Sequence, residues 1–159
     1  MAHEYTATIR WTRGEGSFAD NRYSREHVWV FDGGTEVPAS PAPANVPAPW
    51  SRADAVDPEE AFVAALSSCH MLFFLAFAAK RGFVADSYED HALGIMERNE
   101  RGKLFISRVT LDPKIAWSGE KRPSADDIAE LHRRSHDECY IANSARSEVV
   151  VAGMPADHA

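Results

Sequence analysis

The stretch AFVAALSSCHMLFFLAFAA, residues 61–79, decides the fold of this protein. It carries no charged residue before the basic pair at 80–81, and it is apolar on every side of a helix. Such a helix is buried either in the centre of a globular protein or in a membrane. Ser-Ser-Cys-His at 67–70 opposes the membrane interpretation, because an imidazole that faces lipid is costly. We therefore predict a long, buried core helix.

The ends of this helix are marked by strong sequence signals. Asp57 is a good N-cap, Pro58 suits the first helical position, and Glu60 completes the spacing of a capping box. Gly82 follows the basic pair and is typical of a helix stop. The helix is expected from about Pro58 to Arg81.

Composition places the chain among soluble globular proteins. Its 159 residues suit one domain, and a net charge of −7 with no basic stripe argues against nucleic-acid binding. The N-terminal MAHEYTATIRW lacks the layout of a signal peptide, so a cytoplasmic protein is expected. Two cysteines are too few for a secreted disulfide scaffold.

Hydrophobic periodicity and turn residues predict the remaining elements. They are strands at 3–11 and 27–31, a turn at 32–34 that joins the second strand to another at TEVP (35–38), a proline-rich loop at 38–50, strands at 88–98 and 103–117, a helix at 124–138 capped by Ser124, and a strand at 147–153. Short, hairpin-like connections favour an α+β fold over a doubly wound one. A single domain over 1–159 is expected, with an N-terminal strand lobe at 1–56, the central helix at 57–82, and C-terminal strands and helix at 83–159.

The two cysteines are the first candidates for chemistry. Cys69 lies in the middle of the apolar helix, where a cysteine is often only a small core residue. Cys139 lies at the end of the second predicted helix. Two thiols near helices in a cytoplasmic chain also suit a reversible dithiol–disulfide cycle. Ser67, Ser68 and Asn143 are expected to make only packing or local hydrogen-bonding contacts.

A metal site is an alternative use of the same region. Cys69-His70 and His136-x-x-Cys139 supply two sulfurs and two nitrogens, the donor set of a tetrahedral zinc site. Adjacent residues on a helix point about 100° apart, so Cys69 and His70 chelate one ion poorly. A ligand- or metal-binding protein without redox turnover, and a structural module with an unreactive Cys69, stay open at this point.

Two motifs carry a resemblance to a known family. DPEEAFVAALSSCHML at 57–72 and HDECYIANSARSEVVV at 136–151 resemble the OsmC/Ohr family of thiol-dependent organic hydroperoxide reductases. The resemblance implies antiparallel sheets around a long central helix and an intertwined homodimer. It further implies an organic hydroperoxide substrate, no bound cofactor, and an external dithiol reductant such as a lipoyl group.

The family's functional residues map onto positions of this sequence. The resemblance implies that Cys69 is the peroxidatic cysteine, Cys139 the resolving one, and Glu59 a catalytic glutamate. It also implies a catalytic arginine near the second strand, for which Arg25 is the best match and Arg22 the second choice.

The sequence departs from the family pattern at two places. Tyr140 stands directly after the second cysteine, where members often carry proline, and the loop at 38–50 is longer than in compact members. The first departure bears on the geometry of the resolving cysteine and the second on substrate preference.

These roles fit elementary physics. A guanidinium at Arg25 would hold Cys69 as a thiolate, and Glu59 would orient that guanidinium by a bidentate pair. The apolar side chains at 62–77 would receive the organic part of the substrate, whereas hydrogen peroxide gains nothing from them.

Helix arithmetic predicts a shared site. Glu59 and Cys69 lie ten residues apart, which is about 15 Å along one straight helix. One arginine side chain cannot comfortably reach both. Two such helices packed about a two-fold axis would bury the surplus apolar surface and bring each Glu59 toward the other subunit's Cys69.

Overall fold

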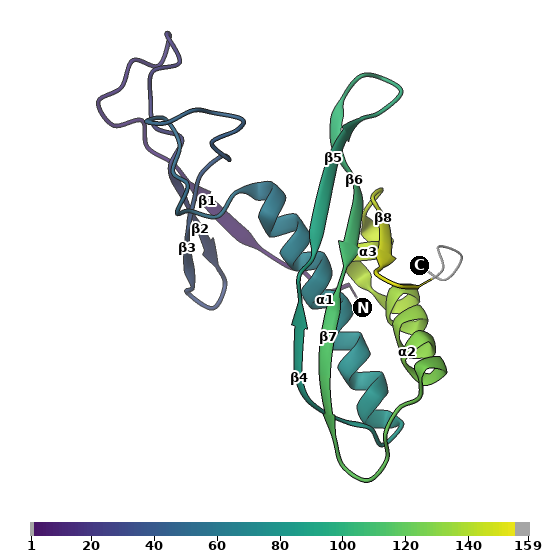
Figure 1. The fold of residues 1–159 in the computed structure, drawn as a ribbon. Coiled ribbons are helices and arrows are strands. Elements are labelled where there is room, and N and C mark those ends of the chain that lie inside the picture. Colours follow the sequence, from purple (N-terminus) through teal and green to yellow (C-terminus); the bar gives the residue numbers. More distant parts are fainter. Residues whose placement is uncertain (1, 155–159) are drawn as a thin grey trace. The chain divides into compact units, whose positions relative to one another are not determined.

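The structure is a computed structural model that describes residues 2–154 (Figure 1). The chain forms two compact units, residues 1–61 and 62–159. The first unit thus extends five residues beyond the expected lobe at 1–56, and its boundary falls in the first turn of helix α1 (Pro58–Lys80).

The first unit contains a three-stranded antiparallel sheet. Its strands are β1 (Ala7–Arg10), β2 (His27–Phe31) and β3 (Glu36–Ala39), in the order β1-β2-β3. Strand β2 matches the prediction, and β3 follows the predicted turn at 32–34, whereas β1 is shorter than 3–11. Pro38 is tolerated in β3 because an edge strand has one side that needs no backbone donor.

Helix α1 begins as the sequence predicts. Glu60 N–H donates to Asp57 Oδ1 at 2.8 Å, and Asp57 N–H donates to Glu60 Oε2 at 3.3 Å, which is the capping box. At the other end Gly82 adopts φ +78°, a conformation that favours glycine and ends the helix.

One chain buries only one stripe of α1. The fully buried residues recur every fourth position: Leu66, His70, Phe74 and Ala78. An 18-residue window of the helix has a mean hydropathy of 2.0, yet only 22% of it is buried, and Leu72 is 63% exposed. The helix is long and apolar enough to cross a membrane by these measures, as are many core helices. The expectation of burial on all sides is therefore not met within a single chain.

The second unit holds two further sheets. Strands β4 (Val84–Asp90) and β7 (Pro113–Ser118) pair antiparallel. Strands β5 (Leu93–Arg98), β6 (Leu104–Leu111) and β8 (Glu148–Val151) form the other sheet, in the order β5-β6-β8, with β8 parallel to β6.

Each of the two long strands predicted for this region is divided in two. The strand expected at 88–98 breaks after Asp90, and the strand expected at 103–117 breaks at Asp112. The Asp90 carboxylate accepts one hydrogen bond from Asp112 N–H at 2.7 Å and another from Ser67 Oγ of α1 at 2.5 Å. Both predicted strands are therefore interrupted at the place where the Asp90 carboxylate bonds to Asp112 and to helix α1.

Helix α2 (Ala125–Glu138) and the short α3 (Tyr140–Ser144) follow β7. The Ser124 cap is confirmed, since Ser124 and Asp127 form a complete capping box. Helix α3 was not predicted from the sequence. Cys139 joins the two helices, as C-cap of α2 and N-cap of α3.

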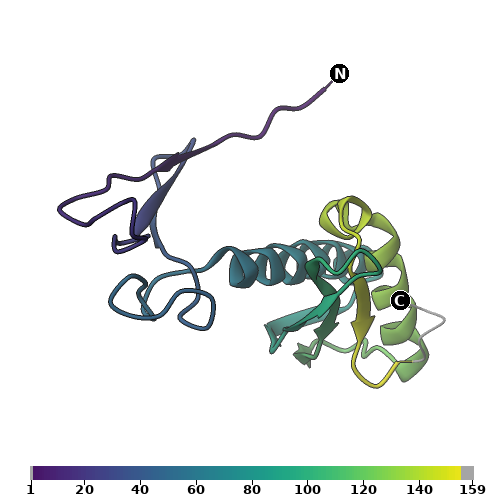
Figure 2. The same cartoon turned by 90° about the horizontal axis from the view of Figure 1, so that it is seen from above.

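Two hydrophobic clusters hold α1 against the strands of the second unit, and Figure 2 shows α1 running alongside these strands with α2 next to it. Leu66 packs with residues of β6 and β8, whereas Phe74 and Ala78 pack with Leu131 of α2 and with residues of β4 and β7. The α+β fold with largely antiparallel sheets and a central helix is thus confirmed.

Candidate active site

The second unit brings Cys69 and Cys139 together. Cys69 lies on α1 and is partly exposed, whereas Cys139 is fully buried between α2 and α3. Both are free thiols, and Cys69 lies near enough to Cys139 to influence the pKa of its thiol. Seventy positions apart in the sequence, they meet because α2 packs against α1 through Leu131 and Phe74.

Burial is the main cause of the shifted pKa of the Cys139 thiol. It raises the pKa of the Cys139 thiol to about 11, because the charged form loses its hydration. A hydrogen bond from Ala142 N–H to Sγ, at 3.4 Å, acts in the opposite direction, and the neighbouring Cys69 adds to the rise. Cys139 is therefore a protonated thiol at neutral pH.

Asn143 fixes the backbone that carries Cys139. Its Nδ2 donates to the carbonyl oxygen of Asp137 at 2.8 Å and to that of Cys139 at 3.0 Å. The expectation of local hydrogen bonding at Asn143 is met, but its consequence for Cys139 was missed. Asn143 reaches these carbonyl groups because it lies on the short helix α3, and no sequence pattern predicted that helix.

His70, the neighbour of Cys69, belongs to a buried histidine pair. Its Nε2 lies 3.0 Å from Nδ1 of His132 on α2, and both residues are almost fully buried. Burial lowers the pKa of His70 to about 3, with smaller effects of His132 and His136, and burial lowers that of His132 to about 4. His70 Nδ1 is buried without a hydrogen-bond partner. Because an unpaired N–H is costlier than an unpaired lone pair, we assign the His70 proton to Nε2, which then donates to His132.

The alternative zinc set is not assembled. His70 pairs with His132 rather than with His136, and within residues 2–154 no three His, Cys, Asp or Glu side chains are grouped as metal ligands.

Arg25 lies in the first unit, just before β2. Its guanidinium donates to the carbonyl oxygens of Asn21 and Tyr23, at 2.8 and 2.7 Å, and stacks over the Tyr23 ring at 3.9 Å. In the described part of the chain it makes no ion pair with Glu59, so the expected bidentate pair is not formed. The second choice, Arg22, is exposed and held through its backbone N–H, which bonds to Ser17.

The carboxylate of Glu59, at the start of α1, has few hydrogen-bond donors around it. One oxygen, Oε1, lies 3.5 Å from Asn45 Nδ2, and the other, Oε2, is buried with no hydrogen-bond partner. A buried carboxylate oxygen without a donor is unfavourable. Glu59 is therefore arranged to receive a further donor.

An aromatic cavity of about 380 Å³ adjoins Arg25 within the first unit. Three of its walls are rings in mutual contact, with Trp11 and Phe18 each near Tyr23 at centroid distances of 5.5 and 4.8 Å. The other lining residues are Ile9, His27, Pro41 and Pro58. Such walls suit an apolar organic group beside a cation.

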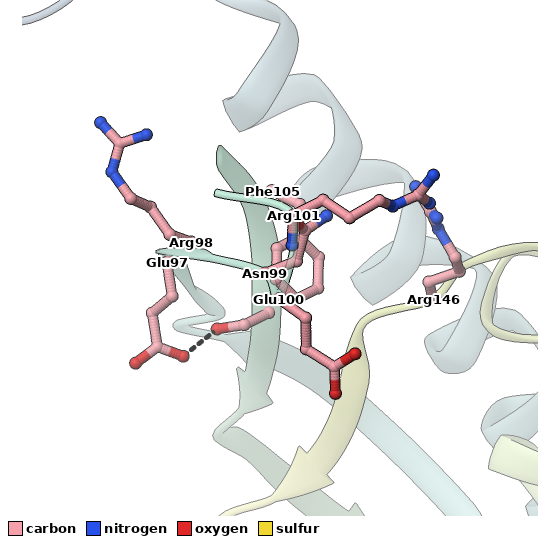
Figure 3. A pocket seen from close by; sticks show the side chains of 8 residues that line it. Glu97, Arg98, Asn99, Glu100, Arg101, Phe105 and Arg146 are labelled. Carbon is pink, nitrogen blue, oxygen red and sulfur yellow. Dashed lines mark hydrogen bonds between the residues drawn. The ribbon is translucent and has the colours of Figure 1, made fainter. Parts of the chain in front are cut away.

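A larger, open cavity of about 830 Å³ lies at the turn between β5 and β6 (Figure 3). Arg101 and Arg146 extend to one side of it, and Glu97 to the other, where it accepts a hydrogen bond from Ser107 at 2.5 Å. Its lining contains no cysteine, so this cavity does not include either of the two thiols.

Comparisons with known proteins agree with this architecture. The family model described as OsmC-like protein matches residues 51–152, which include both cysteines and Glu59. An OsmC-like protein of unknown function from Vibrio cholerae is 46% identical, with a TM-score of 0.92 over 94% of this chain and 98% of that one. No curated protein matches the sequence.

More distant solved structures share the fold. An organic hydroperoxide resistance protein from Elizabethkingia anophelis is 18% identical, with a TM-score of 0.67 over 95% of each chain. The organic hydroperoxide resistance protein OhrB of Bacillus subtilis is 19% identical, with a TM-score of 0.63 over 94% of this chain and 95% of that one. The family match, which spans more than half of the sequence, carries the conclusion: this chain belongs to the OsmC-like family.

Proposed function

We propose that this protein is a thiol-dependent peroxidase that reduces organic hydroperoxides to alcohols. The observation that carries the proposal is the pair of neighbouring free thiols, Cys69 partly exposed and Cys139 buried and protonated. Membership of the OsmC-like family, whose fold hydroperoxide resistance proteins share, supports a stress-related redox role.

The reaction has two steps on this pair. The Cys69 thiolate attacks the distal oxygen of ROOH, the O–O bond breaks, and the alkoxide takes a proton to leave as ROH. Cys69 is then a sulfenic acid. The Cys139 sulfur attacks it, the S–O bond breaks, and the Cys139 proton leaves with the hydroxyl as water, giving the Cys69–Cys139 disulfide.

Arg25 and Glu59 are the proposed supports of the first step. The aromatic cavity beside Arg25 fits the organic part of a hydroperoxide, and hydrogen peroxide would gain nothing from it. The unpartnered Glu59 Oε2 can accept from a guanidinium that has moved out of the Tyr23 site.

The working form in this proposal is a cytoplasmic homodimer with no bound cofactor. The apolar surface that one chain leaves exposed on α1 supports the dimer, because a partner helix would cover it. The disulfide is returned to two thiols by an external dithiol, for which a lipoyl group is the proposed example.

Mass spectrometry after one equivalent of an organic hydroperoxide tests the function. We expect an intramolecular Cys69–Cys139 disulfide, and in Cys139→Ser a sulfenic acid trapped at Cys69, because no second thiol then condenses with it. The yield should follow the amount of hydroperoxide added. Two free thiols after treatment, or stoichiometric zinc in the untreated protein, would overturn the peroxidase proposal.

Replacing Arg25 tests the proposed cation. In Arg25→Ala we expect the oxidation of Cys69 by an organic hydroperoxide to slow by about a hundredfold or more, because the thiolate loses its proposed positive neighbour. Stopped-flow kinetics under single-turnover conditions measure this rate.

Arg22→Ala is the matched control, since it removes an arginine three residues away from the same loop. Its oxidation rate should stay within a few-fold of the wild type. The reverse ranking of the two variants would assign the role to Arg22.

A further inference from the structure

The two sulfurs of the proposed disulfide differ in how an external thiol can reach them. Cys139 has no exposed surface, and the Asn143 amide donates hydrogen bonds to the carbonyl oxygens of Asp137 and of Cys139. Cys69 is partly exposed on α1. Thiol–disulfide exchange depends on access to the sulfur that is attacked.

We propose that the thiol that reduces the Cys69–Cys139 disulfide attacks the Cys69 sulfur, so that Cys139 is always the leaving group. This inference rests on the disulfide of the proposed function and adds the direction of its reduction. The mixed disulfide with the reductant then forms on Cys69 alone.

The surroundings of Cys139 suit a leaving sulfur. The N–H of Ala142 points at Sγ from 3.4 Å and stabilises charge as it develops there. Once expelled, the sulfur lies in the buried site that raises the pKa of the Cys139 thiol to about 11, so it takes up a proton. In the attack on the sulfenic acid the leaving hydroxyl takes the Cys139 proton, but the mixed disulfide has no such group. The protonated thiol is a poor nucleophile there, and Cys139 therefore does not return at once to displace the reductant.

The step balances with one thiolate and one proton. The reductant thiolate forms a bond to the Cys69 sulfur, the Cys69–Cys139 bond breaks, and Cys139 leaves with the electron pair and is protonated. A second reductant thiol then attacks the reductant sulfur of the mixed disulfide. Cys69 is released as a thiolate and the reductant leaves as a disulfide.

Mapping the mixed disulfide tests the direction. The protein is oxidised with copper-phenanthroline rather than a hydroperoxide, mixed with glutathione, and quenched within seconds by N-ethylmaleimide. Peptide mass spectrometry should find glutathione on Cys69 and the maleimide on Cys139. In guanidinium chloride, where both sulfurs are accessible, glutathione should appear on both. Glutathione predominantly on Cys139 of the folded protein would overturn the inference.

Single-cysteine variants give a second measurement that needs no disulfide. Cys139→Ser, which retains Cys69, should react with the aromatic disulfide DTNB about tenfold or more faster than Cys69→Ser, which retains the buried Cys139. Equal rates in the folded variants would also contradict the inference. If the hydroperoxide forms no disulfide while this mapping succeeds, the proposed function fails and the accessibility difference stands.

Discussion

Mixing a Glu59→Ala chain with a Cys69→Ser chain is expected to restore peroxidase activity that neither chain has alone. Cys69→Ser should lose about a thousandfold or more in rate because its sites lack the nucleophile, and Glu59→Ala about a hundredfold because its sites lack the group that orients the arginine. Heterodimers contain one site with the wild-type Cys69 of the first chain and the wild-type Glu59 of the second. Random exchange should therefore recover about a quarter of the wild-type rate.

The structure gives this experiment its rationale. Helix α1 runs without interruption from Pro58 to Lys80 and contains both Glu59 and Cys69. Much of its apolar surface is uncovered in one chain, and Glu59 Oε2 is buried without a donor. A partner chain packed on α1 would cover the surface and supply the donor.

A second mixture serves as control. Cys69→Ser combined with Cys139→Ser should recover nothing, because the two thiols meet within one chain and no heterodimer site contains both. Exchange in both mixtures is verified by mass spectrometry of the intact dimers. Inactive Glu59→Ala/Cys69→Ser heterodimers would show that the glutamate acts within its own chain.

The second large effect concerns stability in acid. The free energy of unfolding is expected to fall by on the order of 2–4 kcal/mol between pH 7 and pH 5, because the buried imidazoles of His70 and His132 stay neutral while those of the unfolded chain become protonated. Urea unfolding at a series of pH values measures the change.

The sign follows from the two pKa values. In the folded protein they are lowered from 6.5 to about 3 for His70 and about 4 for His132. Above pH 6.5 neither state binds the protons and the contribution to stability is complete. As the pH falls below 6.5 the unfolded state binds more protons, and stability is lost progressively until the folded pKa values are reached.

The histidine residues can be followed individually. An NMR titration should show that at least two of the seven histidines remain unprotonated at pH 5. His3→Gln removes an exposed histidine and should leave the acid dependence of unfolding unchanged. An unfolding free energy that stays constant from pH 7 to pH 5 would contradict the neutral, buried pair.

Local signals determined a large part of this fold. The capping boxes of α1 and α2 and the glycine after α1 depend on residues within a few positions of each other, and all three were predicted correctly. Strand β2 was placed at its exact residues from the run HVWVF, which is rich in β-branched and aromatic residues. The family resemblance, carried by the two cysteine motifs, was confirmed by the family match.

The errors in the sequence prediction arise from contacts across long stretches of chain. The strands at 88–98 and 103–117 break because Asp90 bonds to Asp112 and to Ser67, residues that no local pattern links to it. Helix α3 is only five residues long, too short for a periodic pattern to reveal.

The properties of the candidate site also depend partly on local sequence and partly on long-range contacts. The sequence by itself determined which residue types are present and that the helix of Cys69 is continuous and apolar. Only the tertiary structure decided that Cys139 lies near Cys69, that burial keeps it protonated, and that His70 pairs with His132. Burial and contact between distant residues set these properties, and they exist only once α2 has packed on α1.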